Sequence, residues 1–123
     1  MGTGIGIVAA RTAGINVKFV DAFEPSLKRS EEFVKSWIDK EIQKQRMTEQ
    51  DKATMLGRIS YHDNVSKLND VDFAVEAANE DFVLKSRIFD DLAKHTPKHA
   101  ILASNTSSIS ISKIAGQVKD RAH

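Results

Sequence analysis

Five consecutive hydroxyl or amide side chains, Ser104 to Ser108, follow a short apolar segment near the end of the chain. Such side chains donate and accept hydrogen bonds, and a run of five offers far more capacity than one helix cap requires. We therefore expect this segment to bind a polar group such as a carbonyl or a hydroxyl. The alternative is that these residues only cap the helix that follows.

A second polar segment, Glu76 to Asp81, stands where another apolar stretch runs into a predicted helix. Acidic side chains stabilise a helix N-terminus, which by itself accounts for Glu80 and Asp81. Lys85 lies one turn further on and is then expected to pair with Asp81 at a spacing of four residues. From local physics alone, this segment is interpreted as the start of a helix.

Three glycines, Gly2, Gly4 and Gly6, open the chain, and Asp21 ends the β-rich stretch that follows them. The glycines are either the last part of a dinucleotide-binding fingerprint or a helix packed tightly against a sheet. A carboxylate at the position of Asp21 accepts hydrogen bonds from ribose hydroxyls and repels a 2′-phosphate, which favours NAD over NADP. The alternative is that Asp21 is a solvated turn residue or a helix cap.

Histidine is the expected acid–base residue for alcohol oxidation, and the chain contains four. His95 and His99 flank Pro97, so they do not share a helix face as a metal-binding pair. They also precede their strand, which places them at the edge opposite the ligand. His62 is expected to lie away from the other motifs, and His123 is the last residue. We predict no catalytic histidine and no metal site in this chain.

The elements that must position these side chains alternate between strand and helix. We expect strands at Ile15–Asp21, Arg58–His62, Val71–Ala78 and Ala100–Ser104. We expect helices at Thr3–Ala13, from Pro25 to Ile42, from Thr48 to Gly57, from about Asp81 to Lys94 and at Ser108–Val118. This alternation predicts an α/β protein with a parallel sheet, in which the Val71–Ala78 strand is covered on both faces. Ligands of such sheets lie along the carboxyl ends of the strands.

The composition is that of an ordinary globular domain. The chain has 123 residues, of which 41% are hydrophobic and 28% charged, and its net charge is +1. One domain of this size builds one core. The balanced charge argues against a nucleic-acid or membrane-surface partner, because both need a concentrated basic field. Cysteine is absent, which excludes thiolate chemistry, and no apolar run approaches the ~20 residues of a membrane span.

These residues together resemble the NAD-binding domain of the 3-hydroxyacyl-CoA dehydrogenases, including the 3-hydroxybutyryl-CoA enzymes. The resemblance runs nearly end to end, through Met1-Gly2, Val20-Asp21, Val75 to Glu80, and Ala103 to Ser108. It implies an NAD-dependent oxidoreductase of Rossmann fold that oxidises 3-hydroxyacyl-CoA to 3-ketoacyl-CoA in fatty acid β-oxidation or butanoate metabolism. Asp81 stands where the family usually has asparagine, and both residues cap helices well.

The resemblance also implies roles for individual residues, and it replaces the helix-start interpretation of Glu80 and Lys85. Gly2 matches the third glycine of the fingerprint, and Asp21 matches the acid that binds the ribose. The remaining matches are Glu80 and Lys85 at the nicotinamide end of the cofactor, Ser107 at the 3-oxygen of the substrate, and Asn105 as support for that loop.

The long second helix matches the region that contacts the CoA part of the substrate. The candidate residues there are Ser36, Lys40 and Lys44, with Trp37 beside the first of them.

Family members carry a strand and a G-x-G-x segment before the Met-Gly pair. A catalytic histidine, its orienting glutamate and a helical C-terminal domain that dimerises follow the matched segment. We therefore expect residues 1–123 to be a partial Rossmann domain, cut at both ends, that lacks its central first strand. Since that strand lies between the Val17 and Val71 strands in the order 3-2-1-4-5-6, we expect the chain alone to bind NAD weakly and to turn over nothing. We expect it in the cytoplasm or the mitochondrial matrix.

Two other functions fit part of the sequence. A methyltransferase that uses S-adenosylmethionine would use the glycines as G-x-G-x-G and Asp21 for the ribose, but it leaves the Ser104–Ser108 segment without a role. A non-catalytic partner of a full-length dehydrogenase fits the absence of a suitably placed histidine.

Overall fold

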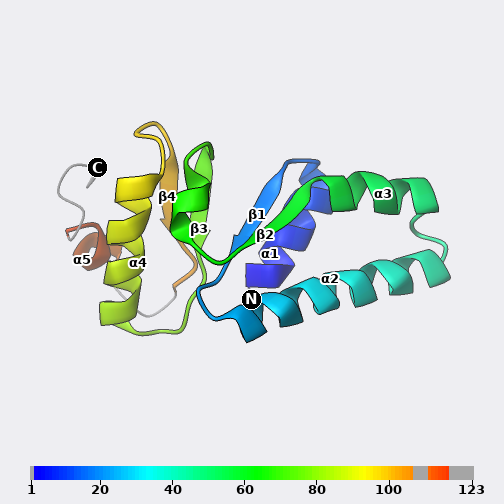
Figure 1. Cartoon of the computed structure of the whole chain (residues 1–123), viewed down its shortest axis with the longest axis horizontal. Helices are drawn as coiled ribbons and strands as arrows, with labels where there is room; N and C mark the ends of the chain where they lie inside the picture. Colours follow the sequence, from blue (N-terminus) through cyan, green and yellow to red (C-terminus); the bar gives the residue numbers. More distant parts are fainter. Residues whose placement is uncertain (1, 107–110, 117–123) are drawn as a thin grey trace. The chain divides into compact units, whose positions relative to one another are not determined.

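Helices and strands alternate along the computed structural model, which describes residues 2–106 and 111–116 (Figure 1). The chain divides into two compact units at residues 64 and 65. We call them the N-terminal unit and the C-terminal unit. Each is an α/β unit with its own pair of parallel strands.

The N-terminal unit contains strands β1 (Val17–Val20) and β2 (Ile59–His62), paired in parallel from Val17 opposite Ile59 to Val20 opposite His62. Between the strands the chain forms helices α2 (Glu24–Gln43) and α3 (Glu49–Gly57), because parallel neighbours need a crossover connection. Both strands therefore end at the same edge of the sheet. Asp21 is the first residue beyond β1 at that edge.

Local sequence signals account for the helices of this crossover. Pro25 lies in the first turn of α2, as predicted, where its missing N–H has no helical partner to lose. At the start of α3, which was expected from Thr48 to Gly57, Thr48 and Asp51 form a capping box, with reciprocal hydrogen bonds of 3.0 and 3.1 Å. The helices cover a core of six buried residues: Ile7, Ala10, Val34, Ile38, Met47 and Met55.

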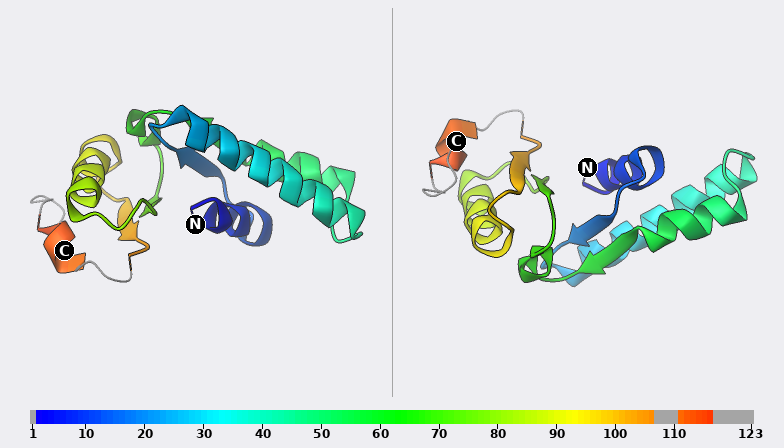
Figure 2. Two further views of the ribbon diagram at one scale, coloured as in Figure 1. Left: turned by 90° about the horizontal axis from the view of Figure 1, so that it is seen from below. Right: turned by 90° about the horizontal axis from the view of Figure 1, so that it is seen from above.

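Helix α1 (Gly2–Val8) packs closely on β1. It continues into a π-helical turn, Ala9–Ala13, which ends at Gly14 with a φ of +69°. A Cβ atom added at Gly6 would overlap the ring of Phe19 in β1, whereas nothing lies within 4 Å of such an atom at Gly4. The predicted helix is thus confirmed, and Gly6 serves close packing. Figure 2 shows α1 beside β1 in two further views.

The C-terminal unit contains strands β3 (Phe73–Glu76) and β4 (Ile101–Ser104), also parallel, with Glu76 opposite Ser104. Helix α4 (Phe82–His95) connects them, and α5 (Ile111–Ala115) follows. A 3₁₀ turn, Val65–Leu68, precedes β3 and was not predicted. The small core joins Phe89 of α4 to Ile114 of α5. Both ends of the helix predicted at 108–118 lie outside the described residues.

Strand β3 differs from its prediction as a strand covered on both faces. Ala74 and Glu76 are buried, at 8% and 3% exposure, but Phe73 and Val75 are 54% and 41% exposed. Successive residues of a strand point to opposite faces. The prediction is wrong because only one face of β3 is covered among the described residues.

The strands of residues 2–106 form two separate pairs, β1 with β2 and β3 with β4. The predicted α/β class with parallel strands is confirmed. Across the part of the chain that the structure describes, no helix has both the length and the apolar character to cross a bilayer.

Candidate functional site

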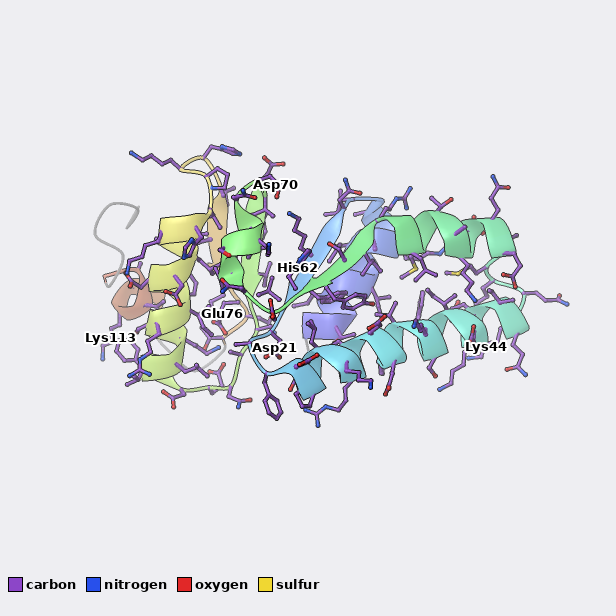
Figure 3. The ribbon with its side chains drawn as sticks, viewed as in Figure 1. Asp21, Lys44, His62, Asp70, Glu76 and Lys113 are labelled. Carbon is purple, nitrogen blue, oxygen red and sulfur yellow. The ribbon has the colours of Figure 1, made fainter. Side chains whose placement is uncertain are left out.

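Asp21 in the N-terminal unit lies just beyond the carboxyl end of β1, as predicted (Figure 3). Its N–H donates a hydrogen bond of 3.1 Å to the carbonyl of His62, which extends the strand pairing by one step. Its Oδ1 accepts a hydrogen bond of 2.9 Å from the N–H of Phe23 and so forms the turn into α2. Oδ2 accepts no hydrogen bond from the described residues. One oxygen of this exposed carboxylate, Oδ1, therefore stabilises the turn, and the other, Oδ2, is open to a ligand.

His62 lies next to this position, contrary to the prediction that it stands away from the other motifs. It is the last residue of β2 and pairs with Val20, directly before Asp21. Its Nε2 lies 2.9 Å from the hydroxyl of Ser60. The prediction was wrong because the register of β2 against β1 depends on contacts far apart in sequence.

A buried ion pair occupies the carboxyl end of β3 in the C-terminal unit. The Nζ of Lys85 lies 2.6 Å from Oε2 of Glu76, and each side chain is only 1% exposed. Burial lowers the pKa of Lys85, but its hydrogen bonds to Glu76 and Glu80 and the charges of both acids outweigh this effect. The net result is a pKa above the ordinary value for lysine, so the ammonium group stays charged.

The carboxylate of Glu76, the last residue of β3, accepts three hydrogen bonds from side chains or backbone. Its Oε1 accepts one of 2.7 Å from the hydroxyl of Ser104, the residue opposite it on β4. Its Oε2 accepts one of 2.6 Å from the N–H of Ala78 as well as that from Lys85. The ammonium of Lys85 also donates to the carbonyl of Ala78 at 3.0 Å. Every oxygen of this buried carboxylate is therefore satisfied, as a buried charge requires.

Glu80 connects this pair to the loop after β4. Its Oε1 lies 3.3 Å from Nζ of Lys85, and its Oε2 accepts a hydrogen bond of 2.6 Å from the hydroxyl of Thr106. The N–H of Thr106 in turn donates to the hydroxyl of Ser104 at 3.2 Å. We call these five residues the Glu76 cluster: Glu76, Glu80, Lys85, Ser104 and Thr106. With both acids ionised, the cluster carries one net negative charge.

The sequence alone indicates that Glu76 to Asp81 start a helix. That interpretation is right for Asp81 and wrong for the pairing of Lys85. Asp81 caps α4, as predicted, because its Oδ1 accepts hydrogen bonds of 2.9 and 3.1 Å from the N–H groups of Val83 and Leu84. The predicted pairing of Lys85 with Asp81 is wrong, since the ammonium of Lys85 turns to Glu76 and Glu80 instead. The carboxylate of Asp81 is already occupied by the cap.

Two further predicted cofactor residues, Asn105 and Gly2, lie at the ends of strands or helices. The N–H of Asn105 donates to the carbonyl of Glu76 at 2.9 Å, which ties the loop after β4 to β3. Gly2 is the first residue of α1. Ser107 lies outside the described residues. Glu76 was not predicted as a site residue, although a glutamate that ends an apolar strand is a signal that could have found it. Ser104 was predicted only as part of the Ser104–Ser108 segment, without a role of its own.

The predicted CoA-contact residues form an exposed row on α2. Ser36, Lys40 and Lys44 follow one another at intervals of four residues, and all three are exposed. Lys44 lies directly after the last helical residue. Trp37, by contrast, is partly buried and packs against the core. The row therefore presents a hydroxyl and two ammonium groups on one side of the helix.

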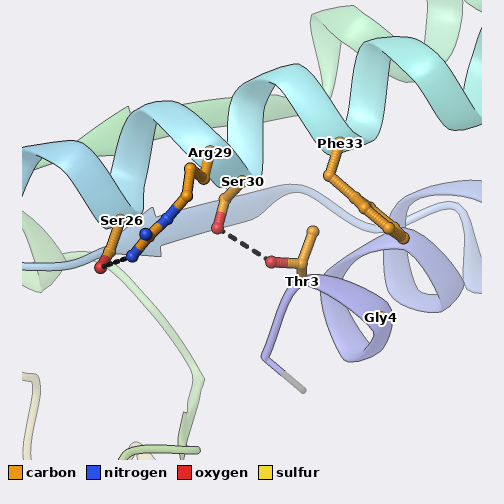
Figure 4. A pocket seen from close by; sticks show the side chains of 6 residues that line it. All are labelled: Thr3, Gly4, Ser26, Arg29, Ser30 and Phe33. Atoms are coloured by element: carbon orange, nitrogen blue, oxygen red, sulfur yellow. Dashed lines mark hydrogen bonds between the residues drawn. The ribbon is translucent and has the colours of Figure 1, made fainter.

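A shallow hollow of the N-terminal unit lies between α1 and the first half of α2 (Figure 4). Its polar groups are already engaged. Thr3 and Ser30 share a hydrogen bond of 2.9 Å, and the guanidinium of Arg29 donates to Ser26 at 2.9 Å. The hollow does not include Asp21.

His95 and His99 lie at the opposite edge of their strand pair, as predicted. His95 ends α4, and His99 precedes β4, where its Nε2 lies 2.8 Å from Oδ1 of Asp72. Residues 2–106 and 111–116 hold no group of three or more histidine, aspartate or glutamate side chains arranged for a metal ion.

Comparison with known proteins places this geometry in one family. The sequence profile of the 3-hydroxyacyl-CoA dehydrogenase NAD-binding domain matches residues 1–123. The chain is 33% identical over 120 residues to a 3-hydroxybutyryl-CoA dehydrogenase of Mycobacterium tuberculosis, a match that covers 97% of this chain and 42% of that protein. It is 32% identical over 115 residues to the fatty acid oxidation complex subunit alpha of Shewanella baltica, covering 94% of this chain and 16% of the relative.

A solved structure agrees with these sequences. The (S)-3-hydroxybutyryl-CoA dehydrogenase from Ralstonia eutropha superposes with a TM-score of 0.91 at 38% identity, over 99% of this chain and 42% of that chain. The chain thus spans less than half the length of these relatives. The matches favour a dehydrogenase over a methyltransferase, and NAD is the cofactor of the matched domain. The chain belongs to the family of 3-hydroxyacyl-CoA dehydrogenase NAD-binding domains.

Proposed function

We propose that this chain is the nucleotide-binding part of an enzyme that oxidises 3-hydroxyacyl-CoA to 3-ketoacyl-CoA in fatty acid β-oxidation or butanoate metabolism. The observation that carries the proposal is Asp21, which keeps one carboxylate oxygen open just beyond the end of β1. NAD, when bound, supplies the acceptor for the hydride of the hydroxyl-bearing carbon. The residues of this chain bind the cofactor and orient the substrate.

The carboxylate of Asp21 fits the adenosine ribose of NAD. Its Oδ1 is held by the N–H of Phe23, so the side chain is fixed and Oδ2 is oriented before a ligand arrives. A ribose hydroxyl would donate to that oxygen, while a 2′-phosphate would be repelled by its charge. This arrangement supports binding of NAD rather than NADP.

We assign Glu80 and Lys85 to the nicotinamide half of the cofactor and Asn105 to support of the adjoining loop. The contacts of Glu80 with Lys85 and Thr106 support this assignment, because they fix a partly exposed carboxylate at the carboxyl ends of β3 and β4. Ser107 would donate a hydrogen bond to the 3-oxygen of the substrate. The exposed ammonium groups of Lys40 and Lys44, with Ser36, suit the phosphates of CoA.

In this proposal, none of the histidines that the structure describes acts as the base that accepts the hydroxyl proton. His99 contacts Asp72 ahead of the strands, and His62 lies beside Ser60. We propose that a histidine and an orienting glutamate outside these residues supply that step. We also propose that the complete enzyme is a homodimer of the cytoplasm or the mitochondrial matrix.

The chain by itself is expected to bind NAD weakly and to produce no NADH from a 3-hydroxyacyl-CoA. The two separate strand pairs support this expectation, because an edge strand leaves backbone groups without ladder partners. A non-catalytic role remains the second candidate, in which the chain pairs with an intact dehydrogenase. Co-purification of the chain with such an enzyme, with a change in its rate, would favour that role.

Isothermal titration of the 123-residue chain with NAD, NADP and S-adenosylmethionine tests the proposal. We expect binding of NAD, weaker binding of NADP and none of S-adenosylmethionine. Replacing Asp21 by Asn keeps the turn but removes the charge, and loss of a charge-assisted hydrogen bond costs ~1.5–3 kcal/mol. The Asp21→Asn variant should therefore bind NAD about 10 to 150 times more weakly. Equal binding of NAD by both proteins, or tighter binding of S-adenosylmethionine, would contradict the proposal.

A further inference from the structure

Lys85 is a buried lysine whose hydrogen-bond donors are used within the chain. An ammonium group has three N–H donors and no acceptor. The Nζ of Lys85 lies 2.6 Å from Oε2 of Glu76, 3.0 Å from the carbonyl of Ala78 and 3.3 Å from Oε1 of Glu80. The side chain of Lys85 is only 1% exposed. Three acceptors thus match three donors, and a cofactor would contact this ammonium only by displacing one of them.

Glu80 is the charged member of the Glu76 cluster that solvent reaches. Its side chain is 43% exposed, against 1% for Glu76 and for Lys85. Its carboxylate is held from two sides, since Oε1 faces the ammonium of Lys85 and Oε2 accepts a hydrogen bond of 2.6 Å from the hydroxyl of Thr106. A group that is fixed before its ligand arrives loses less conformational freedom on binding.

Both partners of Glu80 are themselves anchored on the buried carboxylate of Glu76. Lys85 donates directly to Oε2 of Glu76. Thr106 lies in the loop after β4, and its N–H donates to the hydroxyl of Ser104 at 3.2 Å. That hydroxyl donates in turn to Oε1 of Glu76 at 2.7 Å. The contacts therefore connect the loop after β3, which carries Glu80, to the loop after β4.

We propose that Thr106 and Lys85 are positioning residues that hold the Glu80 carboxylate for the nicotinamide half of NAD, and that Glu80 is the one of these three that contacts the cofactor. This inference rests on the proposed function and divides the roles assigned there to Glu80 and Lys85. The carboxamide of the nicotinamide offers N–H donors that a carboxylate accepts. Thr106 and Lys85 act on the cofactor only through Glu80.

The variant Thr106→Val tests the proposal, because valine nearly keeps the shape of threonine but lacks the hydroxyl that holds Glu80. ADP-ribose is the second ligand, since it has the adenosine, the diphosphate and the second ribose of NAD but no nicotinamide. In isothermal titration of the 123-residue chain, the variant should bind NAD about three to ten times more weakly than wild type. Its dissociation constant for ADP-ribose should stay within about twofold of wild type.

Two further variants separate the hydroxyl from the packing around it. Thr106→Ser keeps the hydroxyl and should return NAD binding to within about twofold of wild type. Thr54→Val is the matched control, since Thr54 is an exposed threonine on α3 in the N-terminal unit. It should leave the dissociation constants of both ligands unchanged.

Carbon NMR of the wild-type chain tests the role of Lys85 without any substitution. On addition of NAD, the Cδ resonance of Glu80 should move in a saturable manner. The Cε resonance of Lys85 should move less, because its ammonium keeps the same three acceptors. A shift at Lys85 as large as that at Glu80 would show direct contact and overturn the division of roles.

Equal weakening of NAD and ADP-ribose by Thr106→Val is the result expected of a merely structural role. That result, or no recovery of NAD binding in Thr106→Ser, would overturn the inference alone, because the wild-type chain would still bind NAD. Failure of the wild-type chain to bind NAD would refute the proposed function, and the inference would fail with it.

Discussion

The packing of Gly6 against Phe19 makes a sharp prediction about stability. A Cβ atom at Gly6 would lie closer to the Phe19 ring than 3.0 Å, a separation that real Cβ atoms essentially never show. The ring has little room to move, because it stacks on Tyr61 with centroids 5.5 Å apart. Gly6→Ala should therefore force α1 and β1 apart. A displacement of β1 would affect the proposed function because Asp21 directly follows β1.

The expected magnitude is the difference between two effects. Overpacking a well-packed core costs ~1–3 kcal/mol, and alanine in place of glycine within a helix contributes about 0.5–1 kcal/mol in the other direction. Taking the middle of each range, Gly6→Ala should lower the free energy of unfolding by about 1 kcal/mol. Urea unfolding followed by the fluorescence of Trp37, the sole tryptophan, reports on this unit because Trp37 packs against its core.

Two companion variants isolate the cause. Gly4→Ala is the control, because nothing lies within 4 Å of the added atom; it should be neutral or stabilising by up to about 1 kcal/mol. In a Phe19→Leu background, which removes the outer ring atoms, Gly6→Ala should lose most of its cost. A Gly6→Ala protein as stable as wild type, or an equal cost in both backgrounds, would refute this account of the packing.

Three further predictions concern the helix caps and the buried ion pair. Lys85→Met leaves Glu76 buried without its counter-charge and should lower the free energy of unfolding by about 3–5 kcal/mol; a loss below about 1 kcal/mol in urea unfolding would contradict the buried pair. Asp81→Ala removes the cap of α4 and should lower the free energy of unfolding by ~1 kcal/mol. Amide hydrogen exchange in the first turn of α4 should become faster, and an unchanged exchange rate would contradict the cap. Hydrogen bonds from the backbone and then the side chain of Thr48 lower the pKa of Asp51 below 3.8. Its contribution to stability is therefore present above that value and is lost as the pH falls through the lower folded pKa; an NMR titration midpoint at or above 3.8 would contradict this.

The parts of the fold that local sequence controls were predictable. The cap at Asp81, the capping box at Thr48 and Asp51, and the left-handed Gly14 each depend on side chains or backbone within a few residues. Asp21 at the end of its strand was predictable for the same reason. These features follow from local hydrogen bonding and backbone conformation.

The features that the sequence did not predict depend on residues far apart in the chain. Lys85 pairs with Glu76, nine residues away, and not with Asp81. Asp81 caps the helix, and the end of β3 lies close to the start of α4. His62 lies beside Asp21 through the register of β2 on β1. The exposure of Phe73 and Val75 depends on which faces of the sheet are covered, and an apolar run does not reveal this.

The most direct test of the account is to map NAD binding on the 123-residue chain by amide chemical shifts at millimolar cofactor. We predict that the largest changes fall on residues that follow the strands, namely Asp21 and Phe23 after β1, Glu80 after β3 and Asn105 after β4. Changes centred on the Thr3–Arg29 hollow or around His99, or no saturable change with NAD, would contradict the central claim that the carboxyl ends of these strands bind the cofactor.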